Sequence, residues 1–234
     1  MLRKHGTRLA VIAAGVLLAA SVVWWGYQAH HERELVSTVT ALARETGTRL
    51  RDALSLDARP PADQAEEINR KFEDHLAAVD GHLRKLRGMD TSSMPALGEA
   101  ADDYVLTGHE ILRRLAASHR SRLQFSQNSR ALQEHMRADR GGGSWVGEAV
   151  RLKDRVEKDF SGHKAATETL ARLLASFPAS QAAIAPYIET PLLIDEKLLD
   201  AVRQRALASA QQATEEIGKI RKWVPRGQGR HQPN

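Results

Sequence analysis

The chain lacks cysteine and strand-like patterning, and both absences narrow what it can be. Its 234 residues contain no cysteine, which excludes disulfide bonds and metal sites built on thiolates. No stretch alternates polar and apolar residues with the two-residue period of a half-buried strand. Apolar residues instead recur every three or four positions, as on one face of a helix. The sequence therefore predicts an all-α protein.

The short motifs of the common enzyme classes are also missing. The chain has no nucleophile elbow, no phosphate-binding loop, no dinucleotide fingerprint and no site for covalent haem attachment. The pair His109-Glu110 begins a zinc-protease motif, but Arg113 occupies the position of the second histidine ligand. The motif fails because both imidazoles must share one helix face. We therefore expect no enzymatic activity and no cofactor.

One long apolar run lies near the N-terminus, at residues 9–27. It reads LAVIAAGVLLAASVVWWGY and contains no charged residue. Nineteen helical residues span about 28 Å at ~1.5 Å each, close to the thickness of a bilayer's hydrocarbon core. Three basic residues precede the run: Arg3, Lys4 and Arg8. Three aromatic residues stand at its other end, where rings favour the headgroup layer: Trp24, Trp25 and Tyr27.

This pattern predicts a single-pass protein of a bacterial inner membrane. Basic residues before the run favour a cytoplasmic N-terminus, which sends the rest of the chain into the periplasm. The predicted divisions are a cytoplasmic tip (1–8), a transmembrane helix (9–27), an exported helical domain (28–223) and a disordered basic tail (224–234). The alternative is a signal peptide cleaved near Ser21, which would also export the domain.

The formal net charge of +5 is distributed unevenly along the chain. Between residues 28 and 218 there are 26 Lys and Arg against 29 Asp and Glu, a net charge of −3. A domain with this balance lacks the basic character expected of nucleic-acid-binding proteins. The basic C-terminal end could contact an acidic surface, although such tails more often serve only solubility. We therefore expect no nucleic-acid partner.

Five long helices are expected, with apolar stripes spaced three or four residues apart. Pro60-Pro61 should end the first helix, which continues from the membrane run, and the triple glycine at 141–143 should separate the third helix from the fourth. The expected helices lie at about 28–59, 62–87, 95–138, 144–177 and 191–223, and Ser144 is the expected cap of the fourth. Ser180 is expected to cap a further short helix that reaches Tyr187. The short connections predict an elongated antiparallel bundle, with the first three helices nearest the membrane.

Histidine is the most unusual residue type, with ten in the chain. His75 and His82 flank an apolar stripe, and we expect them on a solvated face. His119 and His163 each occupy a position in an apolar stripe, and they lie 23 residues before and 21 after Gly142. An antiparallel hairpin would bring them to similar heights.

Polar residues surround the His119 and His163 positions in the sequence, and the candidate ligand-binding set adds Asp159 and Asn128. Buried polar groups must be paired, so the cluster should have a definite role. It could be a hydrogen-bonded pair that fixes the helix register, the wall of a small-ligand pocket, a metal or non-covalent haem site, or a pH-sensing pair. The sequence leaves these alternatives open, and we assign no metal.

Two segments resemble helices of known sensor domains: LQFSQNSRAL at 123–132 and LARLLASFP at 170–178. Together with the basic residues of the cytoplasmic tip (1–8), the single anchor and the long helices, they make the chain similar to periplasmic all-helical ligand-binding domains of bacterial chemoreceptors and sensor kinases. The resemblance implies a helical sensor domain. The chain departs from such receptors because it has no second hydrophobic run, so a sensor of this kind would signal through a partner.

These observations favour a membrane-tethered helical interaction module, a scaffold or accessory subunit of an envelope complex. The alanine-lined final helix, with Ala206, Ala210 and Ala213, could pack closely against a partner or a second copy. A ligand-binding accessory domain is the first alternative, and a pocket at the level of His119 and His163 would favour it. A metal- or haem-binding bundle is the second alternative.

Overall fold

The computed structural model describes residues 2–56, 64–138, 143–188 and 193–222, with side chains from residue 20 onwards. Within these ranges every regular element is helical: α1 (Leu2–Ser55), α2 (Ala65–Arg87), α3 (Pro95–Arg137), α4 (Gly143–Ile184), the 3-10 helix η2 (Ala185–Tyr187) and α5 (Glu196–Lys222). The predicted all-α class and the five long helices are confirmed.

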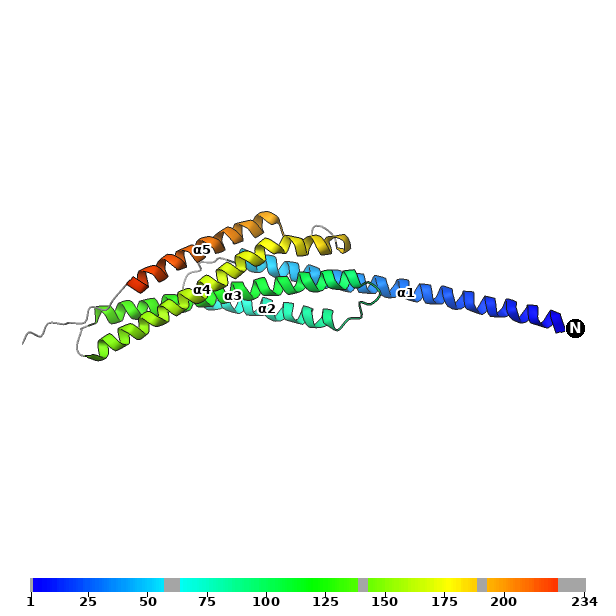
Figure 1. The fold of residues 1–234 in the computed structure, drawn as a ribbon, viewed down its shortest axis with the longest axis horizontal. Helices are drawn as coiled ribbons and strands as arrows, with labels where there is room; N and C mark the ends of the chain where they lie inside the picture. The colour runs from blue at the N-terminus through cyan, green and yellow to red at the C-terminus, as the bar shows by residue number, and fades with distance from the viewer. Residues whose placement is uncertain (1, 57–63, 139–142, 189–192, 223–234) are drawn as a thin grey trace, which may run out of the picture.

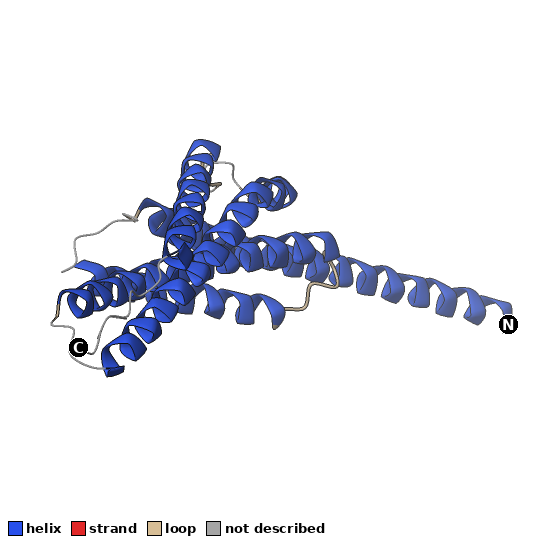
Figure 2. Cartoon of the chain, turned by 60° about the vertical axis from the view of Figure 1, so that its left-hand side comes forward, coloured by secondary structure: helices blue, strands red, loops and turns tan. Residues whose placement is uncertain are grey.

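The two longest bundle helices, α3 and α4, form an antiparallel hairpin along the whole length of the bundle (Figure 1). α2 lies against one side of this hairpin and α5 against the other, and Figure 2 shows α4 crossing α3 at an angle. α1 packs on α2 and α3 with its C-terminal half, while its N-terminal half extends beyond the bundle as a lone helix. The predicted elongated antiparallel bundle is confirmed.

The bundle has two sections, which we name by their position relative to the lone part of α1. The proximal section comprises the second half of α1, α2, the first half of α3, the second half of α4 and the start of α5, and a single apolar core runs through it. The distal section comprises α3 from Arg120, α4 up to Lys164 and the C-terminal part of α5. Its smaller core consists of Val156, Phe160, Ala213 and Ile217. The interior is therefore thickest where four helices overlap.

The predicted apolar stripes of α3 and α5 face the core. Tyr104 and Ile111 on α3 are 0% exposed, and the Tyr104 ring packs on Phe177 with 5.3 Å between ring centroids. On α5, Ala206, Ala210 and Ala213 are buried against the hairpin, because their short side chains let α4 approach closely. These alanines are therefore engaged within the chain.

The end of α4 differs from the prediction, because the helix does not stop at Pro178. It continues through this proline to Ile184, although an interior proline costs about 3 kcal/mol. Buried side chains on both sides offset the cost: Phe177 and Ile184 are 0% exposed. Gln181 adds two hydrogen bonds to the backbone of Ile194, accepting one at 2.6 Å and donating one at 3.2 Å. The separate helix expected from Ser180 to Tyr187 is therefore wrong.

Three helix starts also shift from their predicted positions. α2 begins at Ala65 rather than Ala62, and Ser144 lies inside the first turn of α4 rather than at its cap. α5 begins at Glu196 instead of near Pro191, because the carboxylate of Asp195 accepts a 3.0 Å hydrogen bond from the backbone N–H of Lys197. An aspartate in this position is a strong helix start.

Some predictions fall outside the described residues: the turn at Pro60-Pro61, the centre of the triple glycine at 141–142, and the disordered tail 224–234. For residues 2–19, which include the predicted cytoplasmic tip and most of the apolar run, the structure describes the helix but not the side chains. Within the part of the chain that the structure describes, no helix combines the length and the apolar character needed to cross a membrane.

Candidate functional site

His163 lies at the centre of a hydrogen-bond network that joins three helices. Its Nδ1 lies 3.1 Å from the carbonyl oxygen of Ser118 on α3, and its Nε2 lies 2.8 Å from the hydroxyl of Ser209 on α5. A carbonyl oxygen only accepts, so Nδ1 carries the proton and Nε2 accepts from the serine hydroxyl. One neutral imidazole on α4 thus links both of the helices that flank it.

His119 makes the corresponding link between α3 and α2. Its Nε2 lies 3.2 Å from the carbonyl oxygen of Ala65, in the first turn of α2, and therefore donates its proton. The ring packs on Phe72 with 5.7 Å between centroids. Both histidines are buried, at 7% and 8% exposure, and the prediction that they lie in the apolar stripes is confirmed.

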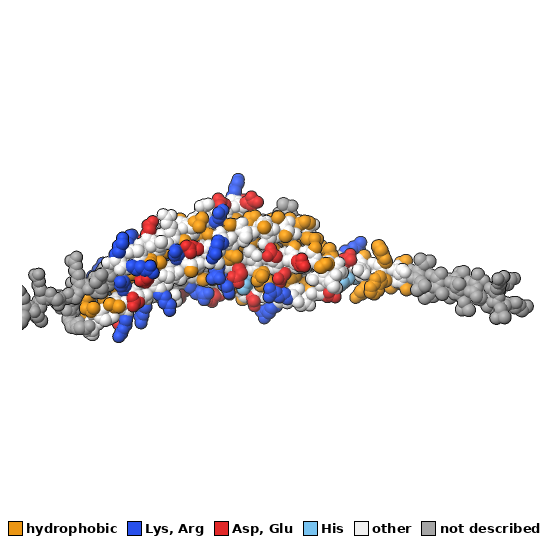
Figure 3. Space-filling view, in the orientation of Figure 1, with side chains coloured by type: hydrophobic (Ala, Val, Ile, Leu, Met, Phe, Trp, Pro, Cys, Tyr) orange, Lys and Arg blue, Asp and Glu red, His pale blue; other side chains and the backbone are white. Residues whose placement is uncertain are grey.

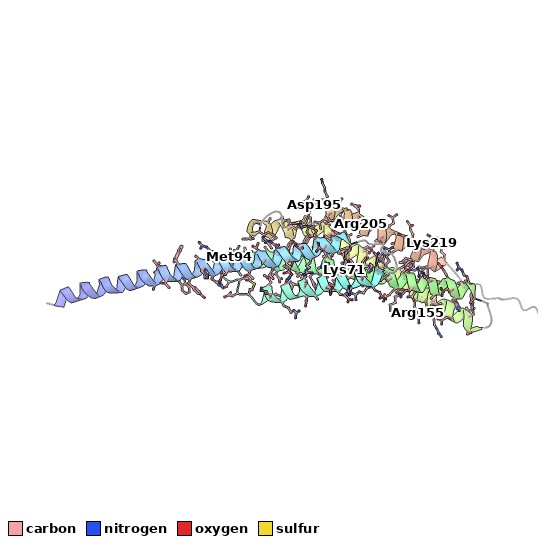
Figure 4. All side chains as sticks on the ribbon, turned by 180° about the vertical axis from the view of Figure 1, so that it is seen from behind. Lys71, Met94, Arg155, Asp195, Arg205 and Lys219 are labelled. Atoms are coloured by element: carbon pink, nitrogen blue, oxygen red, sulfur yellow. The ribbon has the colours of Figure 1, made fainter. Side chains whose placement is uncertain are left out.

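A cavity of about 90 Å³ lies between these two histidines, where α1 ends and α5 begins to cover the hairpin. Both imidazoles line it, together with Ala53 and Leu54 near the end of α1 and Ala206 on α5. Its remaining polar lining comes from Ser118, Thr167, Ser209, Arg122 and Arg205. Arg205 lies on α5, along the upper edge of the bundle in Figure 4. This space, which we call the junction cavity, has an apolar floor and several hydrogen-bonding groups.

Burial lowers the pKa of His119 below its ordinary value, and the positive charge of Arg122 lowers this pKa further, while the bond to Ala65 raises it. His163 behaves in the same way: burial is the main cause of its lowered pKa, and its bond to Ser118 opposes the shift. Desolvation disfavours the charged imidazolium. Both rings are therefore mainly neutral at pH 7, and the hydrogen bonds of both are compatible with a neutral imidazole.

Asn128 and Asp159 lie apart from the two histidines, although the sequence grouped all four residues. The Asn128 amide donates a 2.6 Å hydrogen bond to the Asp159 carboxylate, and neither residue lines the junction cavity. Asp159 lies one helical turn nearer to the hairpin turn than His163. Its partner on α3, Asn128, is therefore also nearer to that turn than His119. The Asn128–Asp159 pair ties the distal hairpin together, and the histidines line the cavity without it.

No protein-family model, curated protein or solved structure matches this chain. The site must therefore be interpreted from its own geometry. Among the described residues, no group of three or more His, Cys, Asp or Glu side chains lies close enough together to hold a metal ion. The hydrogen bonds of His119 and His163 instead engage one nitrogen of the first and both nitrogens of the second within the bundle.

A second feature is an exposed group of large apolar side chains where α1 leaves the bundle. We call it the apolar collar; its exposed fractions are Val22 71%, Val23 72%, Trp24 65%, Trp25 77% and Tyr27 67%. Figure 3 shows these side chains as an orange cluster beside the grey N-terminal end. No other described segment packs over them. Clustered exposure of this kind marks a surface that contacts a protein or a membrane.

The structure also reveals a buried histidine that we expected, from the sequence, on a solvated face. His82 is only 8% exposed, and its Nδ1 lies 3.0 Å from the hydroxyl of Thr46 on α1. Its Nε2 lies 3.3 Å from a carboxylate oxygen of Glu45. His75, placed on the same solvated face, has a buried Nδ1 without a described partner. One sequence feature could have indicated that His82 is buried: Thr46 is a polar residue in the apolar stripe of α1, so it needs a buried hydrogen-bond partner.

The lowered pKa values predict how stability should depend on pH. Between the folded-state pKa values and about 6.5, the unfolded chain binds more protons than the folded chain. The histidine contribution to stability is therefore complete above about pH 6.5 and is lost as the pH falls below that value. Urea unfolding at several pH values should show this decline, and His163→Gln should make it shallower. An unchanged slope in that variant would contradict the prediction.

Proposed function

We propose that the chain is a single-pass, membrane-tethered helical module, held in the bacterial inner membrane with its bundle in the periplasm. The observation that carries the proposal is the apolar collar. Five large apolar side chains in a six-residue stretch stand 65–77% exposed to solvent. In water this arrangement is unfavourable, at roughly 25 cal/mol for each Å² of apolar surface left uncovered. In a bilayer the same side chains would be covered by lipid.

The sequence N-terminal to the collar supports the same placement in the membrane. The apolar run continues from the collar back to Leu9, and Arg3, Lys4 and Arg8 precede it. Trp and Tyr favour the interface between headgroups and hydrocarbon, so the collar would lie at the periplasmic interface. α1 is one continuous helix from Leu2 to Ser55. The bundle would therefore be joined rigidly to its anchor.

The proposed role of the bundle is interaction with a protein or polymer of the envelope, as a scaffold or accessory subunit. The long, charged outer surface supports this role, as does the absence of a recognisable catalytic motif in the sequence. The partner in this proposal can also be a second copy of the chain, bound through the helical faces of the bundle. A receptor-type mechanism would require a partner to carry the message across the membrane.

Two measurements test the tether. The mass of the protein purified from membranes should equal that of the full chain, 25.9 kDa, because an anchor is not cleaved. Membranes washed with alkaline carbonate should retain the protein. A mass corresponding to cleavage near Ser21, together with release into the wash, would show that the run is a signal peptide.

Small-molecule binding is a second candidate function, and the junction cavity favours it. A cavity of about 90 Å³ admits only a few non-hydrogen atoms, so a ligand would be very small. Ala206→Leu should place its added carbons in the cavity. Native mass spectrometry of the full chain in mild detergent should then detect a bound small molecule in the wild type and none in the variant. An unliganded wild type would reject this candidate.

A further inference from the structure

Basic and acidic residues are distributed unevenly along the bundle. The net charge of −3 for residues 28–218 does not show this. Residues 28–119 contain twelve Lys and Arg against sixteen Asp and Glu. Residues 120–164, which form most of the distal section, contain ten Lys and Arg against six Asp and Glu. In Figure 3 blue side chains project from both edges of the distal end. The end of the bundle farthest from the collar is therefore basic.

Four of these cations are exposed and have no ion pair with any other described residue: Arg130, Arg137, Arg155 and Lys158. Other basic residues nearby are neutralised, as in the pairs Arg151–Glu148 and Arg221–Glu157. We call the four unpaired residues the basic tip. Figure 4 shows Arg155 projecting from the side of the distal section opposite to Lys219 on α5.

The register of the hairpin gives the spacing of the basic tip. Asn128 bonds to Asp159, and nearer the turn His135 and Trp145 exchange two hydrogen bonds of 2.8 and 3.0 Å. These contacts place Lys158 level with the residues next to Asn128, so the four cations lie along about 13 Å of the hairpin, at ~1.5 Å per residue. Arg130 and Arg137 are seven apart and share a face of α3, while Arg155 and Lys158 are three apart and share a face of α4.

The composition of this surface favours an anionic polymer as its partner, rather than a protein or a single-stranded nucleic acid. Protein interfaces rely on buried aromatic anchors, and single-stranded nucleic acid is held by exposed aromatic platforms. No aromatic side chain is exposed in the described distal section: Trp145 is 8% exposed and Phe160 6%. Three of the four cations are arginines, whose guanidinium groups fit phosphate through two parallel hydrogen bonds.

Position excludes the anchoring membrane as the source of that phosphate. About 40 Å of helix separates Tyr27 from the end of α1, and the basic tip lies about 17–27 Å beyond the level of His119. Under the proposed orientation, the tip is about 60–70 Å from the collar.

We propose that the basic tip binds a linear, phosphate-bearing polymer located away from the anchoring membrane. The location of the polymer rests on the proposed function, because the tether sets the distance from the membrane, whereas binding at the tip does not require the tether.

The test is a titration of the full chain, in micelles of an uncharged detergent, with fluorescently labelled inorganic polyphosphate. Fluorescence anisotropy at several salt concentrations gives the affinity and its salt dependence. Removing all four charges in R130Q/R137Q/R155Q/K158Q should weaken binding about tenfold or more, and it should reduce the slope of log K against log salt by about three. Circular dichroism should be unchanged, because all four positions are exposed.

A matched control removes four exposed cations of the proximal section that have no ion pair with any described residue: Arg33, Arg70, Lys85 and Arg172. This control should keep most of the wild-type affinity, because the contacts at the tip remain. Equal losses in the two variants would overturn the proposal, since overall charge would then be the cause. Failure of the wild type to bind polyphosphate at low salt would also overturn it, as would tighter binding of the carboxylate polymer polygalacturonate. None of these results depends on whether the chain is anchored.

Discussion

Phe177→Ala should lower the free energy of unfolding by about 3–5 kcal/mol, the usual cost of removing a buried phenylalanine. Phe177 is 0% exposed and packs against Tyr104, whose own ring is buried and whose pKa is raised to about 12 by that burial. The residue also precedes Pro178, so its burial helps to keep α4 helical through an interior proline. Urea unfolding followed by circular dichroism measures the change.

Leu207→Ala is the matched control for this measurement. Leu207 lies on the outer face of α5 and is 42% exposed, so the loss should be within about 0.5 kcal/mol. An equally small loss for Phe177→Ala would show that α4 does not pack against α3 through this pair of rings. In that case the account of how α4 continues past Pro178 would also be wrong.

The double variant Leu17→Arg/Leu18→Arg should release the protein from membranes. Each arginine near the centre of a spanning helix costs about 2.5–3.5 kcal/mol, so the two together disfavour insertion by roughly 5–7 kcal/mol. The expected result is transfer of most of the protein from the membrane pellet to the soluble fraction after an alkaline carbonate wash.

Leu207→Arg controls for the added charge, because this position lies on the exposed face of α5 in the bundle. The control should remain in the membrane pellet. Retention of the double variant at the wild-type level would contradict a lipid-spanning run and would favour attachment through the bundle or a partner.

Local spacing predicted much of this fold because most helices bury one regular stripe. The stripe Leu199, Val202 and Ala206 on α5 could be identified from its period alone, and all three residues are buried. The similar heights of His119 and His163 followed from their distances to the triple glycine. A long antiparallel hairpin leaves little freedom in register, so counting residues from the turn was sufficient.

Other features depended on tertiary contacts that no local pattern contains. Pro178 signals a helix end by local chemistry, yet burial of Phe177 and the bonds of Gln181 to Ile194 overrule it. His82 looked like a surface residue because its partner Thr46 is 36 positions away. Grouping Asp159 with His163 ignored the rise of one helical turn, about 5.4 Å. That rise moves Asp159 to the level of Asn128.

The central claim is that the apolar run spans a membrane and leaves the bundle on its outer side. Because the chain has no cysteine, a single introduced thiol reports the location of one position. His5→Cys and Ala208→Cys place that thiol before the run and on an exposed position of α5. In bacterial cells with a permeabilised outer membrane, a membrane-impermeant maleimide should label position 208 and should label position 5 only after the inner membrane is lysed. Labelling of position 5 in unlysed cells, or protection of position 208 until lysis, would contradict the account.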